Sequence, residues 1–293
     1  MARWGVKDFV AEFVRIRTLG GLPSEVSRLR LRVFFNDCPH SGECGYGSMM
    51  RLQFLGTGGY HPNERRHTAC VWLPDIGVVF DAGTSAFRIQ SRLKTSELDI
   101  FLTHAHLDHV CGLTNFIIPF ITKQLTRGTV HAREPYLTDV QKHLFSPLLF
   151  PINPGFDYRE LANEVRLSDG GLLTHIPLVH PGGSTGFRID WPGKSLAYIT
   201  DTTTSDDYLE FIRGVDMLIH ECNFPDSMAP WSAKPGHSNT TPVAELAREA
   251  QVKRLFLIHF DPQHPEDDPI GIATARAIFP NTEMAEDLME VEF

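Results

Sequence analysis

Apolar runs recur along the chain from about residue 50 onward, each bounded by glycine, proline or a short polar cluster. Short runs rich in β-branched and aromatic residues predict buried strands, and apolar positions three or four residues apart predict helices between them. Strands are expected at 51–55, 69–73, 77–81, 99–103, 173–179, 185–190, 195–200, 216–220 and 254–259. Helices are expected after Thr84, Asp108, Glu134, Ser205, Thr241 and Asp268. This alternation predicts a layered α/β domain.

Residues 1–48 do not follow this pattern, because a helical stretch gives way there to an arginine-rich segment and a glycine-rich loop. We expect an N-terminal extension at 1–48 and one domain at 49–293. Met49 and Met50 stand directly before the first strand, which leaves open whether translation begins there and the extension is foreign to the native protein. Cys38, His40 and Cys44 have ligand-like spacing, but three candidate ligands are too few to predict a zinc site.

The composition is that of a globular protein, with 42% hydrophobic and 22% charged residues in 293. A net charge of −9 argues against general nucleic-acid binding, which uses basic surfaces. Five scattered cysteines predict no disulfide framework. The sequence shows neither a secretory signal nor an apolar run long enough for a bilayer, so we expect a cytoplasmic protein without membrane contact.

The segment "IFLTHAHLDHVCGL", residues 100–113, carries the chemistry. It places His104, His106, Asp108 and His109 directly after a buried strand. Burying these groups without partners would cost several kcal/mol each, so a metal is the expected partner. Alternation around residue 105 lets both first imidazoles point to one side, while the other two groups turn into a helix. This spacing suits two metals held by one loop.

Further ligand candidates stand at the ends of other predicted strands. His180 precedes a glycine-rich turn, Asp201 ends "LAYITD" and His259 ends "RLFLIH". Side chains at the ends of buried strands reach a shared edge of the sheet. A dinuclear centre built from these positions would activate water and polarise a substrate oxygen, so the expected reaction class is hydrolysis through a metal-bridging hydroxide.

Together these motifs resemble those of the metallo-β-lactamase fold superfamily, over about Met50 to Phe293. The resemblance implies a four-layer αββα sandwich, so that residues 49–293 form a metallo-hydrolase domain. It also implies that one metal is held by His104, His106 and His180, the other by Asp108, His109 and His259, with Asp201 bridging. Asp81 matches a position that steadies the histidine loop rather than binding metal.

The sequence is most similar to the ribonuclease Z and phosphodiesterase branch of that superfamily, in "FLGTGG", "HPGGSTGFRI", "IHECNF", "PGHSNTT" and "LIHFDP". The catalytic candidates are His237, Asp108 and Glu221. His237 is expected to donate a proton to the leaving oxygen or to hold a phosphoryl oxygen, and Glu221 to orient it. The alternative for His237 is a neighbour of a helix cap, and the alternative for Glu221 is a solvated carboxylate.

The expected substrate follows from one departure from the ribonuclease Z enzymes, which generally carry a long tRNA-gripping arm between the third histidine motif and the bridging aspartate. Only about twenty residues separate His180 from Asp201 here, which fits a hairpin. We therefore expect small or short phosphodiester substrates rather than folded tRNA. A lactone, thioester or sulfate-ester hydrolase on the same metal site remains an alternative, as does a non-catalytic binding module.

Zinc is the first expectation for the two divalent ions, although manganese or iron suits the same ligands. The loop 223–239, with Phe224, Trp231 and Lys234, is a candidate substrate lid. Two apolar segments, 114–125 and 143–156, can pack in the core, line a pocket or bury the face of a homodimer. The sequence does not name the physiological substrate.

Overall fold

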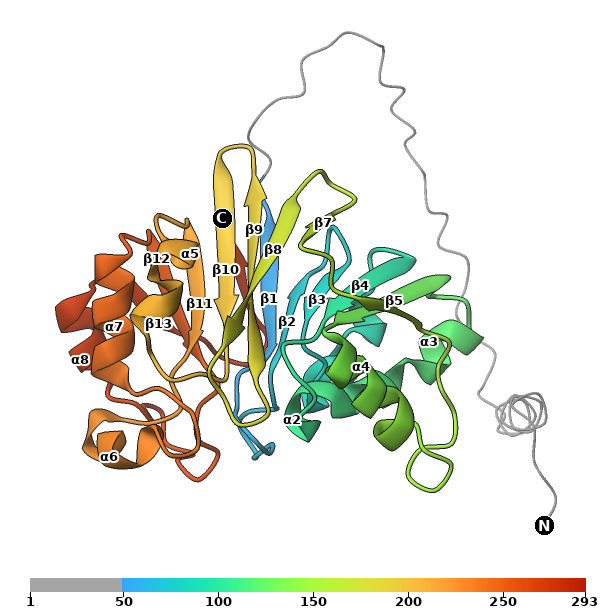
Figure 1. Cartoon of the computed structure of the whole chain (residues 1–293), viewed down its shortest axis with the longest axis horizontal. Helices are drawn as coiled ribbons and strands as arrows, with labels where there is room; N and C mark the ends of the chain where they lie inside the picture. The colour runs from blue at the N-terminus through green and yellow to red at the C-terminus, as the bar shows by residue number, and fades with distance from the viewer. Residues whose placement is uncertain (1–48) are drawn as a thin grey trace, which may run out of the picture. The chain divides into compact units, whose positions relative to one another are not determined.

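Two seven-stranded sheets packed face to face form the centre of this computed structural model, which describes residues 49–293 (Figure 1). The first sheet has the order β14 (Met289–Glu292), β1 (Arg51–Gly56), β2 (Cys70–Leu73), β3 (Val78–Phe80), β4 (Glu97–Phe101), β5 (Arg127–Ala132) and β6 (Asp157–Glu160). The second has the order β13 (Thr282–Met284), β12 (Arg254–Ile258), β11 (Met217–Glu221), β10 (Lys194–Ile199), β9 (Ser184–Trp191), β8 (Leu172–Leu178) and β7 (Glu164–Arg166). The expected extension at 1–48, with Cys38, His40 and Cys44, lies outside the described residues.

Each sheet contains a block of parallel strands, β3 to β6 in the first and β10 to β13 in the second. The remaining neighbours are antiparallel. Strands β2, β3 and β11 are buried at every position, as expected for strands covered on both faces. Because the carboxyl ends of parallel strands lie at one edge, each block brings several strand ends together there.

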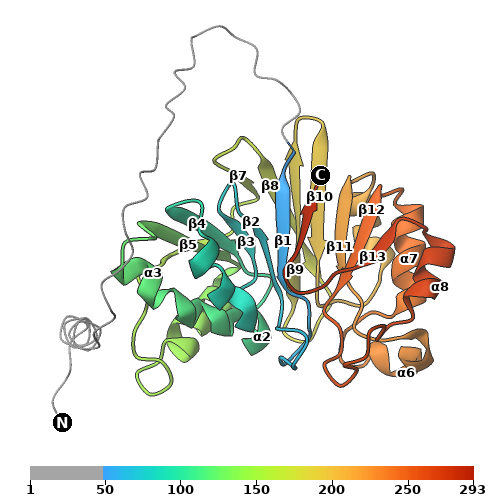
Figure 2. The ribbon, with the colours of Figure 1, turned by 180° about the vertical axis from the view of Figure 1, so that it is seen from behind.

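Helices cover the outer face of both sheets (Figures 1 and 2). The first sheet carries α2 (Leu107–Val110), α3 (Ile117–Ile121), α4 (Glu134–Asp139) and the π-helical turn η4 (Val140–Leu144), together with 3₁₀ turns η1 (Thr84–Arg88), η2 (Gln90–Arg92) and η3 (Cys111–Phe116). On the side of the second sheet are η5 (Asp206–Tyr208), α5 (Leu209–Ile212), η6 (Asp226–Met228), α6 (Ala229–Ser232), α7 (Thr240–Glu249) and α8 (Ile272–Ile278).

Three apolar clusters separate these layers. One lies between the sheets, where Phe80 stacks against Phe187 and Tyr198 at centroid distances of 5.6 and 5.1 Å. The other two pack each sheet against its own helices. The expected αββα sandwich is therefore confirmed. Among residues 49–293, no helix is long and apolar enough to span a membrane.

Several elements differ from the sequence-based prediction. The segment after Thr84 forms 3₁₀ turns instead of an α-helix. Strands β6 and β7 were not expected, because charged residues give "DYRE" and "EVR" no apolar pattern. Both lie at sheet edges, where an exposed strand tolerates charge. The apolar segments 114–125 and 143–156 contribute Phe116, Leu125, Leu144 and Phe156 to the core.

Candidate metal centre

The candidate residues gather at the edge where the parallel strands of both sheets end. Asp81 follows β3, Asp201 follows β10 and His259 follows β12. All three adopt positive φ angles, of 57°, 51° and 62°, which residues other than glycine rarely adopt. Such backbone conformations persist only where surrounding contacts hold them, and they are frequent at active sites.

Three groups of ligand-type side chains meet at this edge: two of them share Asp201, and the third consists of Glu221, His237 and His259. The first ligand cluster consists of His104, His106, His180 and Asp201, and the second of Asp108, His109, Asp201 and His259. Within each cluster the ligand atoms lie within 4.8 Å of one another. The first cluster takes two side chains from the loop after β4 and the second takes two from α2, and each takes two more from strand ends of the second sheet. Every metal-ligand candidate from the sequence is thus in one of the two clusters.

Asp201 lies between the clusters. Its Oδ2 is 3.5 Å from Nε2 of His104 and 3.7 Å from Nε2 of His180. Its Oδ1 is 3.3 Å from Nε2 of His109 and 3.2 Å from Nε2 of His259. Each carboxylate oxygen therefore faces one cluster, which is the arrangement that a bridging ligand needs.

The donor set fits divalent metal ions. His104 is 1% exposed, and its Nε2 has no hydrogen-bond partner. Leaving a buried polar atom unpaired costs about 1–3 kcal/mol, whereas a metal ion would use its lone pair. Nε2 of His109 also lies 3.3 Å from Nε2 of His259, so two imidazole nitrogens face each other across the second cluster. A cation would satisfy both lone pairs.

The outer nitrogens of several rings are held by the protein. Nδ1 of His109 donates to Asp81 at 2.9 Å, and Nδ1 of His180 donates to the Gly236 carbonyl at 3.0 Å. Protons on these outer nitrogens leave Nε2 free to bind metal. Asp81 also accepts hydrogen bonds from the Thr103 amide at 2.8 Å and from the Tyr198 hydroxyl at 3.0 Å. It steadies the loop, as the resemblance implied.

Burial and mutual charge determine the protonation of the clusters. Burial, and next the positive charge on His109, lower the pKa of His104 well below its usual value. Burial raises the pKa of Asp201, but the positive charge and the hydrogen bond of His109 oppose it, and the pKa lies well below the usual range. The cluster therefore presents an ionised carboxylate next to a neutral imidazole, the forms that bind metal.

His237 and Glu221 form a pair beside the clusters. Nδ1 of His237 donates to Oε1 of Glu221 at 2.9 Å, and the His237 ring lies 5.1 Å from that of His180 and 5.2 Å from that of His259. Burial lowers the pKa of His237, but the charge and hydrogen bond of Glu221 outweigh it and raise that pKa to about 9. The imidazole is therefore predominantly protonated near neutral pH.

Glu221 is completely buried at the end of β11. Besides His237 it accepts hydrogen bonds from the amides of Thr202, Ser238 and Asn223, at 2.8, 3.2 and 3.3 Å. This excludes the alternative of a solvated carboxylate. Because both oxygens are already occupied, Glu221 orients His237 rather than serving as a metal ligand.

Two arginines in the loop between β1 and β2, Arg65 and Arg66, bond to carboxylates of the C-terminal segment. The Arg65 guanidinium pairs with Glu286 and Asp267, and Arg66 is buried against the ring of Phe260 and bonded to Glu286. The Arg65 guanidinium is thus paired, and Arg66, which is 1% exposed, is not accessible to a phosphate.

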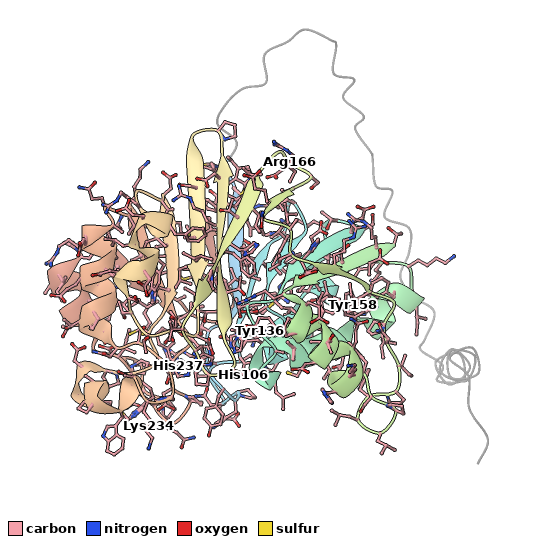
Figure 3. All side chains as sticks on the ribbon, in the orientation of Figure 1. His106, Tyr136, Tyr158, Arg166, Lys234 and His237 are labelled. Carbon is pink, nitrogen blue, oxygen red and sulfur yellow. The ribbon has the colours of Figure 1, made fainter. Side chains whose placement is uncertain are left out.

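The lid candidate lies next to the centre, with its helix α6 close to His237 (Figure 3). The His237 amide donates to the Ser232 carbonyl at 2.9 Å, and Trp231 of the same helix is 64% exposed. Whether the segment selects substrate stays a prediction.

Three supporting residues were missed by the sequence analysis. Tyr198 bonds Asp81 across the two sheets, Asn223 donates to the His259 carbonyl at 2.8 Å, and the Tyr136 hydroxyl donates to the Gly182 carbonyl at 3.3 Å. Asn223 had a usable signal, because it is polar and follows a buried strand. The two tyrosines stand among apolar residues in the sequence and look like ordinary core positions. Their hydrogen-bond partners are distant in sequence, so no local pattern indicates them.

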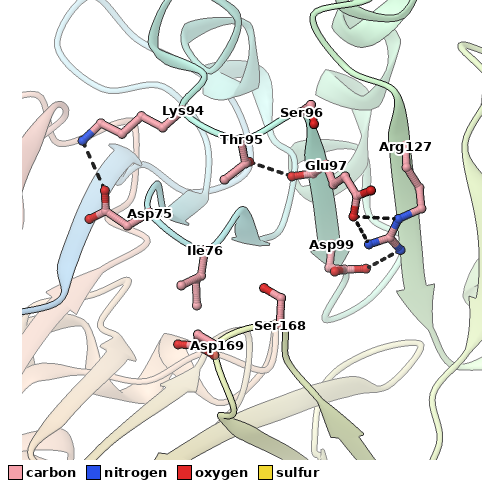
Figure 4. Close-up of a pocket in the computed structure, with 10 residues that line it drawn as sticks. All are labelled: Asp75, Ile76, Lys94, Thr95, Ser96, Glu97, Asp99, Arg127, Ser168 and Asp169. Atoms are coloured by element: carbon pink, nitrogen blue, oxygen red, sulfur yellow. Dashed lines mark hydrogen bonds and ion pairs between the residues drawn. The ribbon is translucent and has the colours of Figure 1, made fainter. Parts of the chain in front are cut away.

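A cavity of about 560 Å³ lies at the edge of the sheets opposite the ligand clusters, near the amino ends of β4 and β5 (Figure 4). Its basic side chains Lys94 and Arg127 are paired with Asp75 and Glu97, at 3.5 and 2.7 Å. The charges of both basic side chains are therefore already balanced. The cavity lies at the amino ends of the parallel strands, whereas the ligand clusters lie at their carboxyl ends. It is therefore not the substrate site of the candidate metal centre.

This structure is a four-layer sandwich with histidine and aspartate clusters at one edge. These two features together define a class of metal-binding proteins. The family model described as "Beta-lactamase superfamily domain" matches residues 77–260, and the chain belongs to this superfamily. That stretch contains every candidate ligand from His104 to His259.

Comparison with individual proteins shows which members of the superfamily the chain is similar to. Ribonuclease Z of Methanosarcina acetivorans is 28% identical over 299 aligned positions, which cover 83% of this chain and 98% of the relative. The short form of human tRNase Z has a TM-score of 0.66 at 22% identity, covering 83% of this chain and 98% of that one. A diphosphatase from the PhnP family has a TM-score of 0.64 at 22% identity, covering 84% and 98%. The expected likeness to the ribonuclease Z and phosphodiesterase branch is confirmed.

Proposed function

We propose that this protein is a dinuclear metal-dependent phosphodiesterase that acts on small or short phosphodiesters. Membership of the superfamily and the ribonuclease Z relatives make it a metal-dependent hydrolase. The observation that carries the phosphodiesterase proposal is the position of Asp201 between two histidine-rich clusters, with a protonated His237 beside them. Zinc is the proposed ion, and manganese or iron fits the same donors.

The residues divide the work of hydrolysis. The first ligand cluster and the second, joined by Asp201, hold the ions. Divalent ions so placed supply Lewis acidity toward a phosphoryl oxygen and activate water near neutral pH. Asp108 completes the second cluster, where its Oδ2 lies 3.4 Å from Nε2 of His259.

His237 supplies the proton in this proposal. Its Nδ1 is held by Glu221, so Nε2 is the nitrogen that can donate to the leaving oxygen. A pKa of about 9 keeps the ring charged at neutral pH, so it is ready to act as an acid. Phosphodiesters with poor leaving groups should depend most on this proton.

The preference for small substrates rests on the segment between His180 and Asp201. It consists of a short turn, strand β9, the bend at 192–193 and strand β10, which occupy all of its residues. The alignment with the Methanosarcina acetivorans ribonuclease Z has 299 positions but covers only 83% of this chain, so many positions of that relative have no counterpart here. The net charge of −9 also disfavours a large polyanion such as folded tRNA.

Metal content and bis(p-nitrophenyl) phosphate turnover, measured on the same preparations, test this proposal. We expect two ions per chain and turnover in the unmodified protein, as the two clusters imply. Asp201→Ala should lose both, while His237→Ala should keep its metal and lose turnover, most strongly for a diester whose leaving group is poorer than p-nitrophenolate. His175→Ala is the control, because its ring bonds the Ala162 carbonyl away from the clusters. Metal without phosphodiester turnover would contradict the proposal and favour a carboxylic, thioester or sulfate ester.

A further inference from the structure

An apolar cavity of about 200 Å³ adjoins the first ligand cluster. Its walls come from the loop after β4, from α4 with the π turn η4, and from the segment that follows. They are Ala105, Leu107, Val110, Asp139, Val140, His143, Leu144 and Leu149. Ala105 and Leu107 are the chain neighbours of His106, so the cavity begins directly beside a metal-ligand candidate.

The wall formed by η4 has an unusual backbone. Val140, His143 and Leu144 all belong to one π-helical turn. This conformation is rare in proteins, and where it occurs it is often at a functional site. On the other side, Leu107 and Leu149 are 67% and 64% exposed. The cavity therefore has an apolar entrance as well as an apolar floor.

Helix α4 connects this cavity to the other half of the first ligand cluster. Tyr136 of α4 donates to the Gly182 carbonyl, in the turn that follows His180. A Cβ at Gly182 would lie 3.9 Å from Nε2 of His106, so this turn contacts the cluster closely. Figure 3 shows Tyr136 and His106 at the same edge of the sheets. Helix α4, which leads into the cavity wall η4, is thus bonded to the turn that carries His180.

We propose that this cavity, the apolar subsite, binds a planar aromatic group carried on one ester oxygen of the substrate, such as a nucleobase or another aryl group. The inference rests on the proposed function, because it assumes that the phosphate binds at the ligand clusters. An apolar floor with a few polar groups at the rim is typical of such pockets. Here the rim groups are His143 and Asp139, 3.7 Å apart and both exposed, which can bond the edge of a base.

Substrate preference tests the subsite. Bis(p-nitrophenyl) phosphate and methyl p-nitrophenyl phosphate have the same leaving group and differ only in the group that is retained. Leu149→Ala should lower the ratio of their kcat/KM values about tenfold, as loss of apolar contact in a pocket does. Leu148→Ala is the matched control, since Leu148 is completely exposed and does not line the cavity. An unchanged ratio in Leu149→Ala would overturn the inference.

A binding measurement separates this inference from the proposed function. We would titrate the zinc-loaded protein with 1-naphthyl phosphate and with methyl phosphate by calorimetry, which requires no turnover. The naphthyl compound should bind about tenfold more tightly, and Leu107→Ala/Leu149→Ala should remove that difference. Equal affinities would overturn the subsite and leave the phosphodiesterase proposal standing. A Leu149-dependent difference without diester turnover would support the subsite and contradict the phosphodiesterase.

The same variants test the competing occupant, a second copy of this chain. Sedimentation of the unmodified protein and of Leu149→Ala would show whether these leucines hold a dimer together. A dimer that Leu149→Ala dissociates would assign the surface to subunit contact and overturn the subsite.

Discussion

The Glu221 carboxylate holds Nδ1 of His237 at 2.9 Å from within a fully buried position, bonded on both oxygens. This fixes the orientation of the His237 ring and makes its charge depend on one carboxylate. Glu221 is thus a positioning residue whose effect should appear in the pH dependence of the reaction.

Replacing Glu221 by Gln should move the basic limb of the kcat/KM profile to lower pH. The limb reports deprotonation of His237, whose pKa of about 9 is raised by Glu221 against the opposing effect of burial. Without the negative charge, burial prevails and the pKa falls. Phosphodiester turnover between pH 6 and about 10 would measure the shift. Glu210→Gln, at an exposed carboxylate paired with Arg213, is the control, and an unmoved limb in Glu221→Gln would contradict the role assigned to Glu221.

Removing the metal should lower thermal stability. The clusters bring buried imidazoles and carboxylates together, and an ion that binds only the folded state stabilises it by about 4 kcal/mol at a thousand times its Kd. Melting of chelator-treated protein with increasing Zn²⁺ would measure this gain. Asp201→Ala should lose most of it and His175→Ala should retain it. A zinc-independent melting temperature would refute the metal centre.

Tyr198→Phe should weaken metal binding without touching a ligand. Tyr198 bonds Asp81, which in turn holds His109, and loss of such outer contacts lowers metal affinity about 10–100-fold. Loss of a hydrogen bond to a charged group should also cost about 1.5–3 kcal/mol of unfolding free energy. Competition with a zinc chelator and urea unfolding measure the two effects. Tyr158→Phe, whose hydroxyl bonds exposed Asn153, should change neither appreciably.

His220 should contribute to acid sensitivity of the metal-free protein. Its ring is buried between the Tyr208 hydroxyl, at 2.9 Å, and the Glu221 carbonyl, at 2.7 Å, and burial lowers its pKa. In the unfolded chain a histidine takes up its proton near pH 6.5, so the stability from neutral His220 is complete above that pH and is lost as the pH falls below it. Urea unfolding at pH 7.5 and 5.5 should show a smaller loss in His220→Gln than in the unmodified protein. An equal loss in both would exclude this role, and His264→Gln is the control.

Trp231→Ala should alter substrate preference more than metal content. Trp231 is largely exposed on α6, and the carbonyl of the adjacent Ser232 accepts a hydrogen bond from the His237 amide, so α6 lies beside His237 while Trp231 belongs to neither cluster. Turnover of several diesters beside metal analysis of the same samples would decide. An equal loss of substrate preference and of metal content would contradict the lid hypothesis.

The meeting of the candidate ligands at one edge was predictable, because the segments that carry them follow buried apolar runs whose ends lie together. His220 shows the limit of this argument. It stands near the end of the buried strand β11, as the ligand candidates stand at the ends of other strands, yet it bonds Tyr208 and belongs to neither cluster. Other features were not predictable, because they depend on contacts between residues distant in sequence. These features are the hydrogen bonds of Tyr198 and Tyr136, the burial of Arg66 and the strands β6 and β7.

Each ligand cluster takes two side chains from the segment after β4 and two from the second sheet. During biosynthesis, the first half of the domain therefore emerges with His104, His106, Asp108 and His109 but without the bridging Asp201. Neither half alone contains all four side chains of either cluster. We expect metal acquisition to come after the sheets dock, so a nascent chain would not trap the wrong ion at high affinity before the fold has set the geometry.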